Sequence, residues 1–181
     1  MRVAPIGLVR QFSPQEAFRL AAEAAALTHG HVSGYLSAGM MAAILRHLID
    51  VADIRGAIES SLSILATYPG HDETTAAVRN ALAAVRAKPA DHSAAIQALG
   101  GGWVGEEALA IAIYSTLSAD TFVDAIRTAA NHSGDSDSTA SIAGQLWGAS
   151  GGLKGMPHRW VSALDVRVPT LHLARRLIPF V

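Results

Sequence analysis

The sequence contains no cysteine, and this absence removes several classes of function at once. Without thiols the chain cannot form disulfides, use a thiolate nucleophile, or hold a thiolate zinc site or an iron–sulfur cluster. Excess charge is also lacking, because 14 basic residues stand against 15 acidic residues and the formal net charge is −1. No overall positive field therefore draws the chain to nucleic acid or to anionic lipid. Any partner must be recognised at a local site.

The sequence also lacks an unbroken apolar run of the ~20 residues that a membrane-spanning helix needs. Pro5 and Gly7 interrupt the apolar N-terminus, so no signal-peptide core is predicted there. We therefore expect no membrane partner and a cytoplasmic location. No internal repeat, low-complexity tract or linker divides the chain, which predicts that residues 1–181 form one domain.

The apolar pattern is helical throughout. Ala, Leu and Ile recur at three- and four-residue intervals, and strand-like alternation of β-branched residues is almost absent. The pattern predicts an all-α, orthogonal multi-helix domain. Helix starts, glycines and prolines divide it into expected helices at residues 13–27, 32–50, 53–67, 72–87, a short one after Pro89, 104–116, 120–130, 139–149, and two shorter ones from Pro157 and Pro169.

A turn rich in oxygen ligands precedes one of these helices. Asp135 and Asp137 alternate with Ser136 and Ser138 directly after Gly134. Carboxylates and hydroxyls are the ligands that Mg²⁺, Mn²⁺ and Ca²⁺ prefer, and carboxylates two residues apart can converge on an irregular turn. The same residues are also typical of a helix N-terminus, where Asp and Ser cap backbone N–H groups, and the local sequence alone favours this second interpretation.

A glycine-rich segment carries the second candidate site. Gly100, Gly102 and Gly105 match the dinucleotide-binding G-x-G-x-x-G pattern, but the residues before them look helical, so the match is accidental. Glycine lets the backbone approach a ligand closely, and Trp103 offers a stacking face for a ribose or an adenine. The alternative, which the residues alone favour, is a helix connection with Trp103 in the core.

His29 is the third candidate. It stands at a helix end, where an imidazole either binds the last backbone carbonyls or reaches into a cleft. Capping is the more common of these roles. The eight histidines are scattered along the chain without metal-binding spacing, so no histidine-based zinc site is predicted.

Taken together, five short segments resemble the ADP-ribosylglycohydrolase family in both residues and order. This family has an all-α fold with a two-magnesium centre that removes ADP-ribose from modified residues. The resembling segments are residues 1–7 (MRVAPIG), 27–30 (LTHG), 102–109 (GWVGEEAL), 133–138 (SGDSDS) and 155–157 (GMP).

The resemblance implies a role for each candidate residue. Asp135, Asp137 and the hydroxyl of Ser138 match metal ligands of the family's Gly-Asp-Thr-Asp-Thr motif, in which both threonines are serine here. Serine keeps the hydroxyl but has more rotamer freedom than threonine. The two aspartates would therefore be catalytic through the metal pair, which is Mg²⁺ or alternatively Mn²⁺. His29, Gly102 and Trp103 match positions that line the ADP-ribose cleft.

The implied activity is hydrolysis of the glycosidic bond that joins ADP-ribose to a protein side chain or to a small molecule. The family's Thr-Asp-Asp metal motif has no counterpart in this sequence. One expectation is therefore that a separate N-terminal half or another copy in a homo-oligomer completes the site. The alternative is a catalytically inactive family member that acts as a helical binding or oligomerisation module.

Overall fold

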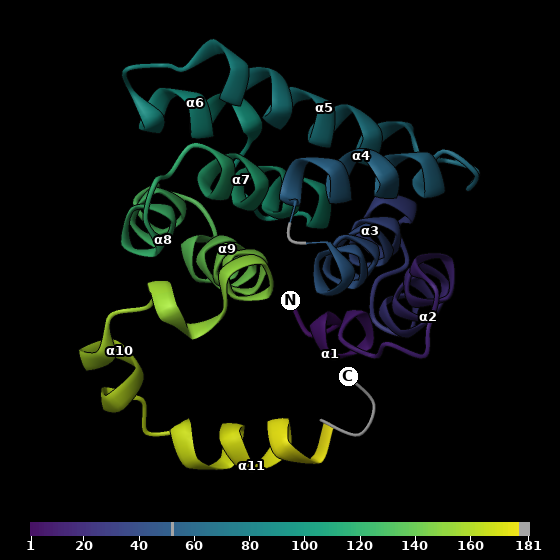
Figure 1. Ribbon diagram of the computed structural model, residues 1–181. Coiled ribbons are helices and arrows are strands. Elements are labelled where there is room, and N and C mark those ends of the chain that lie inside the picture. Colours follow the sequence, from purple (N-terminus) through teal and green to yellow (C-terminus); the bar gives the residue numbers. More distant parts are fainter. Residues whose placement is uncertain (52, 178–181) are drawn as a thin grey trace.

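The computed structural model describes residues 1–51 and 53–177, and all regular structure in these ranges is helical (Figure 1). The all-α fold predicted from the apolar pattern is confirmed. The elements are α1 (Ala4–Gly7), α2 (Pro14–Ala26), α3 (Val32–Asp50), α4 (Ile54–Leu65), α5 (Asp72–Ala87), α6 (His92–Leu99), α7 (Gly105–Leu117), α8 (Phe122–Ala130), α9 (Ser136–Gly151), the 3₁₀ helix η1 (Gly152–Gly155), α10 (His158–Ala163) and α11 (Arg167–Leu177).

Most predicted helix boundaries lie close to the observed ones, and those of α3 and α5 coincide with them. The start of α9 differs in a way that matters for the candidate site. This helix begins at Ser136, three residues before the predicted start. Serine and aspartate are weak helix formers in a helix interior, but they are favoured in the first turn, where N–H groups are free and the helix dipole attracts negative charge. Asp137 and Ser138 therefore lie on the helix and not in a preceding loop.

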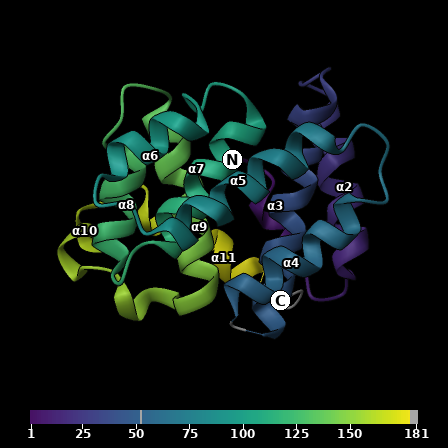
Figure 2. The same cartoon turned by 90° about the horizontal axis from the view of Figure 1, so that it is seen from above.

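Two helices, α3 and α7, form the centre of the molecule. α3 packs mainly against α2, α4 and α1, and α7 packs mainly against α5, α9 and α8. Seen from above, α5 crosses over this pair (Figure 2). Every residue from 108 to 116 of α7 is buried, so this helix has no polar face. α3 is long and apolar enough to cross a membrane by length and composition alone, but 67% of its most apolar window is buried inside the molecule. A helix buried in a protein core is equally long and apolar, and the burial of α3 fits that description.

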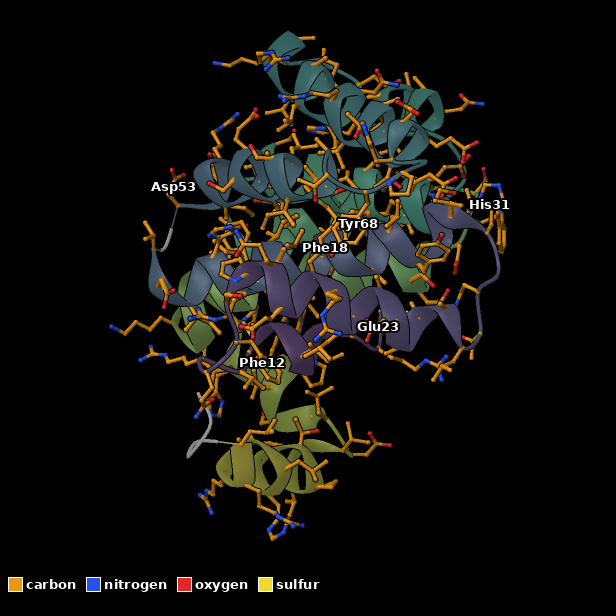
Figure 3. All side chains as sticks on the ribbon, turned by 90° about the vertical axis from the view of Figure 1, so that its right-hand side faces the viewer. Phe12, Phe18, Glu23, His31, Asp53 and Tyr68 are labelled. Carbon is orange, nitrogen blue, oxygen red and sulfur yellow. The ribbon has the colours of Figure 1, made fainter. Side chains whose placement is uncertain are left out.

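Small residues let α3 approach its neighbours closely. A Cβ atom at Gly39 would lie 2.8 Å from the ring of Phe18 on α2, and one at Gly7 would collide with the carbonyl of Ala42. Phe18 stacks on Tyr68, with ring centroids 4.5 Å apart, where the chain leaves α4 (Figure 3). The close approach of α1, α2 and α3 brings the N-terminus against the middle of the molecule.

The C-terminal helices stand apart from this core. α11 makes its principal contact with α10, and Figure 1 shows it (yellow) separated from the body. An edge-to-face contact between Phe122 and Trp160, with centroids 6.0 Å apart, joins α10 to α8. Several large apolar side chains remain exposed in this region: Leu153, Leu164, Val166, Val168, Leu171 and Leu173.

Candidate active site

A cavity of about 560 Å³ opens between the N-terminal segment, the α2–α3 connection, the start of α7 and the start of α9. Its floor is apolar, and its polar groups are few. Side chains of the floor are Val3, Ile6, Met41, Leu109 and Ile142. Concave and largely apolar sites of this size, with a few convergent polar groups, are typical of small-molecule binding.

Five of the six candidate residues line this one cavity, although they come from three separate parts of the sequence. His29, Gly102, Trp103, Asp135 and Ser138 all form its wall. Asp137 does not line the cavity and is exposed on the first turn of α9. The structure thus places these residues together, while the roles that the resemblance implies for them stay predictions.

Asp135 stands at the N-terminal boundary of α9. Its carboxylate makes no hydrogen bond that caps the backbone of this helix. A hydrogen bond with the hydroxyl of Ser138 is the largest influence on it and lowers the pKa of Asp135 below its ordinary value. Asp135 is therefore ionised at neutral pH. Its carboxylate, the neighbouring carboxylate and the hydroxyl form a compact set of oxygen ligands.

His132 supports the loop that carries Asp135, and sequence reasoning missed it. The backbone N–H of Gly134 donates to Nδ1 of His132 over 3.1 Å, and Nε2 lies 2.9 Å from the Thr139 hydroxyl. That hydroxyl itself donates to the Ala129 carbonyl over 2.6 Å. These partners assign the proton to Nε2, which donates to Thr139. The sequence shows only a histidine between two small polar residues. Such a local pattern does not reveal which distant groups the imidazole contacts.

The glycine segment shapes the adjoining wall. Gly100 and Gly102 have φ values of +118° and +75°, a region that residues with a side chain rarely adopt. Trp103 is 73% exposed and lines the cavity. The interpretation of Trp103 as a core residue is therefore wrong, because the bend at Gly102 turns the indole away from the helices.

His29 combines the two roles that the sequence left open. Its Nδ1 lies 3.3 Å from the Ala25 carbonyl at the end of α2 and 2.8 Å from the Thr28 hydroxyl. The residue also lines the cavity. A ring fixed at a helix end in this way presents its remaining edge in a defined direction.

No group of three or more histidine, aspartate or glutamate side chains that could hold a metal occurs in residues 1–51 and 53–177. Mg²⁺ is commonly held in proteins by one or two carboxylates and keeps several waters. Asp135, Asp137 and Ser138 fit one such hydrated ion in the chemistry of their donor atoms. A second ion would need further ligands.

Comparison with known proteins decides the family. The family model described as ADP-ribosylglycohydrolase matches residues 1–180. The chain belongs to this family. An uncharacterized protein of Archaeoglobus fulgidus is 31% identical over 178 residues, which are 98% of this chain and 56% of the relative. The chain thus spans about half the length of that relative. No solved structure matches the chain.

Two relatives in this family have names that state an activity. The ADP-ribosylarginine hydrolase Tri1 of Pseudomonas putida is 46% identical over 55 residues, which are 30% of this chain and 15% of the relative. The ADP-ribosyl-[dinitrogen reductase] glycohydrolase of Rhodospirillum rubrum is 41% identical over 49 residues, 27% of this chain and 17% of the relative. Both similarities are local, so they support the family and leave the activity of this chain to be argued from its site.

Proposed function

We propose that this chain is a magnesium-dependent ADP-ribosyl hydrolase domain, acting on ADP-ribosylated protein side chains or ADP-ribosyl small molecules. The convergence of His29, the Gly102–Trp103 segment and the Asp135–Ser138 turn on one cavity carries the proposal. These segments are far apart in the sequence, and in a member of this family they are the ones expected to contact the ligand. The family membership and the geometry support the same site independently.

The cavity offers two kinds of surface to such a ligand. The exposed indole of Trp103 is available for stacking against an adenine or a ribose face. Asp135 and Ser138 supply oxygen atoms at the adjoining wall, where the polar part of the ligand would lie.

The reaction breaks the bond between C1″ of the ribose and the nitrogen or oxygen of the modified group. Water forms the new C1″–O bond, and its proton passes to the leaving group. Asp135, Asp137 and Ser138 would hold Mg²⁺, which would orient the ribose hydroxyls and the water. The Asp135 carboxylate, whose pKa is lowered by its hydrogen bond with Ser138, would stabilise the positive charge that develops on the sugar. Ser138 fixes the orientation of that carboxylate.

ADP-ribose release from an ADP-ribosylated arginine peptide, with Mg²⁺ and with chelator, tests the proposal. We expect chelator to abolish release and Asp135→Asn to lower it at least about tenfold, because a lost ligand should cost no less than a lost outer-shell partner. The affinity of Asp135→Asn for Mn²⁺, measured by calorimetry, should fall together with its ADP-ribose release. The matched control is Asp120→Asn, an exposed aspartate that does not line the cavity and should behave as wild type.

Absence of release from a folded wild-type chain that has Mg²⁺ would overturn the proposal for the chain by itself. The second candidate function, a helical binding or oligomerisation module, would then be favoured by the exposed apolar residues of α11 and of the segment before it. Light scattering after size-exclusion chromatography detects a homo-oligomer, which without release would support the oligomerisation module. Activity restored by a separate N-terminal polypeptide of the family would show instead that another chain completes the site.

A further inference from the structure

Glu107 lies beside the candidate site without belonging to its wall. It occupies the first turn of α7 and does not line the cavity. One carboxylate oxygen, Oε2, accepts hydrogen bonds from the backbone N–H groups of both Gly101 and Gly102, each over 3.0 Å. A carboxylate that receives two backbone N–H groups makes charge-assisted hydrogen bonds, which are about twice as strong as neutral ones. We call residues 100–103 the glycine loop and residues 134–138 the carboxylate loop.

The same glycines contact the carboxylate loop. The carbonyl of Gly101 accepts a hydrogen bond from the backbone N–H of Asp135 over 2.8 Å. This carbonyl and the N–H of Gly102 belong to one peptide group, so Glu107 binds one end of that group and Asp135 binds the other. Hydrogen bonds in such a chain polarise one another and strengthen together. A carboxylate at the Gly102 N–H therefore makes the Gly101 carbonyl a better acceptor for Asp135.

Packing leaves the two loops no room to move past each other. A Cβ atom at Gly134 would collide with the carbonyl of Gly101, and one at Gly102 would lie 2.9 Å from the side chain of Thr139. Thr139 in turn holds the carboxylate loop through its own bond to the Ala129 carbonyl. A displacement of the glycine loop must therefore displace the carboxylate loop as well.

We propose that Glu107 is a positioning residue, which holds the Trp103 wall and the Asp135 wall of the cavity in one arrangement. Favourable placement in the first turn of α7 explains an acidic residue at this position, but it does not explain two hydrogen bonds to a loop outside the helix. Because of this link, order imposed on one loop is transmitted to the other. The meaning of the link for catalysis rests on the proposed function, whereas the link itself concerns the protein without ligand.

Amide hydrogen exchange of the ligand-free protein tests the link directly. In Glu107→Ala we expect exchange of the Gly101, Gly102 and Asp135 amides to accelerate at least about tenfold, as loss of a charged hydrogen-bond acceptor implies. Amides of α3 should be unchanged. Glu107→Gln keeps an acceptor oxygen and should restore part of the protection. The matched control is Glu23→Ala on α2, whose side chain is 60% exposed and does not line the cavity.

The outcomes separate clearly. Faster exchange at Gly101 and Gly102 with an unchanged Asp135 amide would overturn the proposal, because the effect would end at the glycine loop. Equally faster exchange of the α3 amides would also overturn the proposal, because Glu107 would then stabilise the fold in general. If Glu107→Ala does not fold, Glu107→Gln takes its place. We then expect a smaller acceleration of exchange at the same three amides, those of Gly101, Gly102 and Asp135.

A binding measurement connects the link to the site. The Mn²⁺ affinity of Glu107→Ala should fall about tenfold although Glu107 touches no metal ligand side chain, as is usual when an outer supporting group is lost. Unchanged affinity would contradict transmission to Asp135. Should the wild-type chain bind no Mn²⁺ and release no ADP-ribose, the proposed function fails, and the exchange pattern still decides whether Glu107 joins the two loops.

Discussion

At the scale of single residues, the candidate site depends on atoms that make no contact with a ligand. His132 fixes the N–H of Gly134, and Thr139 fixes the side chain of His132. Glu107 fixes the glycine loop from the other side. Such supporting groups hold the oxygen atoms of Asp135 and Ser138 in place before any ligand arrives, and preorganisation of this kind lowers the cost of binding.

The contact between the two loops predicts a strong effect of one methyl group. Gly134→Ala places a Cβ atom against the backbone of Gly101, which cannot rotate away as a side chain can. We expect the free energy of unfolding to fall by about 1–3 kcal/mol, the usual cost of overpacking. Urea denaturation followed by circular dichroism measures it. Gly30→Ala, where a Cβ atom meets nothing within 4 Å, is the control, and an equal loss there would refute the steric explanation.

At the scale of elements, the helices begin where short-range chemistry starts them. The hydroxyl of Ser13 accepts from the N–H of Glu16 over 3.2 Å, and the Glu16 carboxylate accepts from the N–H of Ser13 over 2.7 Å. This reciprocal cap, with Pro14 at the first helical position, is the start predicted from the sequence. It directs α2 across α3, and the end of α2 carries His29 to the cavity.

The cap also predicts a pH dependence of stability. Hydrogen bonds from the backbone and then the side chain of Ser13 lower the pKa of Glu16 from its ordinary 4.5. A lowered folded-state pKa means that the unfolded chain binds the proton more readily, so the stabilising contribution is complete above the ordinary value and is lost as the pH falls through the lowered one.

We therefore expect Glu16→Gln to be less stable than wild type at neutral pH, with the difference lost as the pH falls from above 4.5 through the lowered pKa of Glu16. Urea denaturation over that pH range measures it, with Glu23→Gln on the same helix as control. Ser13→Ala removes the other half of the cap and should cost about 1 kcal/mol. A difference between Glu16→Gln and wild type that persists unchanged in acid would show that the carboxylate charge contributes nothing.

At the scale of the whole molecule, stability is unevenly distributed. α3 and α7 are enclosed by other helices, whereas α10 and α11 are exposed along most of their length. Helices of 6 and 11 residues are too short to be stable in water without packing partners. Local opening at the C-terminal end should therefore cost far less free energy than opening of the core.

Limited digestion with trypsin tests this distribution. We expect the first cuts at Lys154, Arg159 and Arg167, and a resistant fragment that begins at residue 1 and ends near Lys154. Arg86 on α5 and Arg127 on α8 serve as internal controls, because cutting there requires opening of helices that pack against α7. Mass spectrometry identifies the fragments. Early cleavage at either control site would show that the core is as easily opened as the C-terminal helices.

The sequence by itself determined the helices and the identity of the candidate residues. Caps, breaks and apolar spacing act within a few residues, so they located α2, α3 and α5 closely, and the ordered motifs pointed to the family. The start of α9 was missed because the same short polar residues suit both a loop and a first helical turn.

Only the tertiary structure decided how these residues meet. The cavity joins residues from positions 29, 102–103, 135 and 138, and no local pattern specifies contacts over such separations. It likewise decided that Trp103 is exposed, because a bend at Gly102 sets the direction of the indole. The supports from Glu107 and His132 became visible for the same reason: a side chain finds its hydrogen-bond partner in space, after packing of α7, α8 and α9 has brought distant backbone groups within reach.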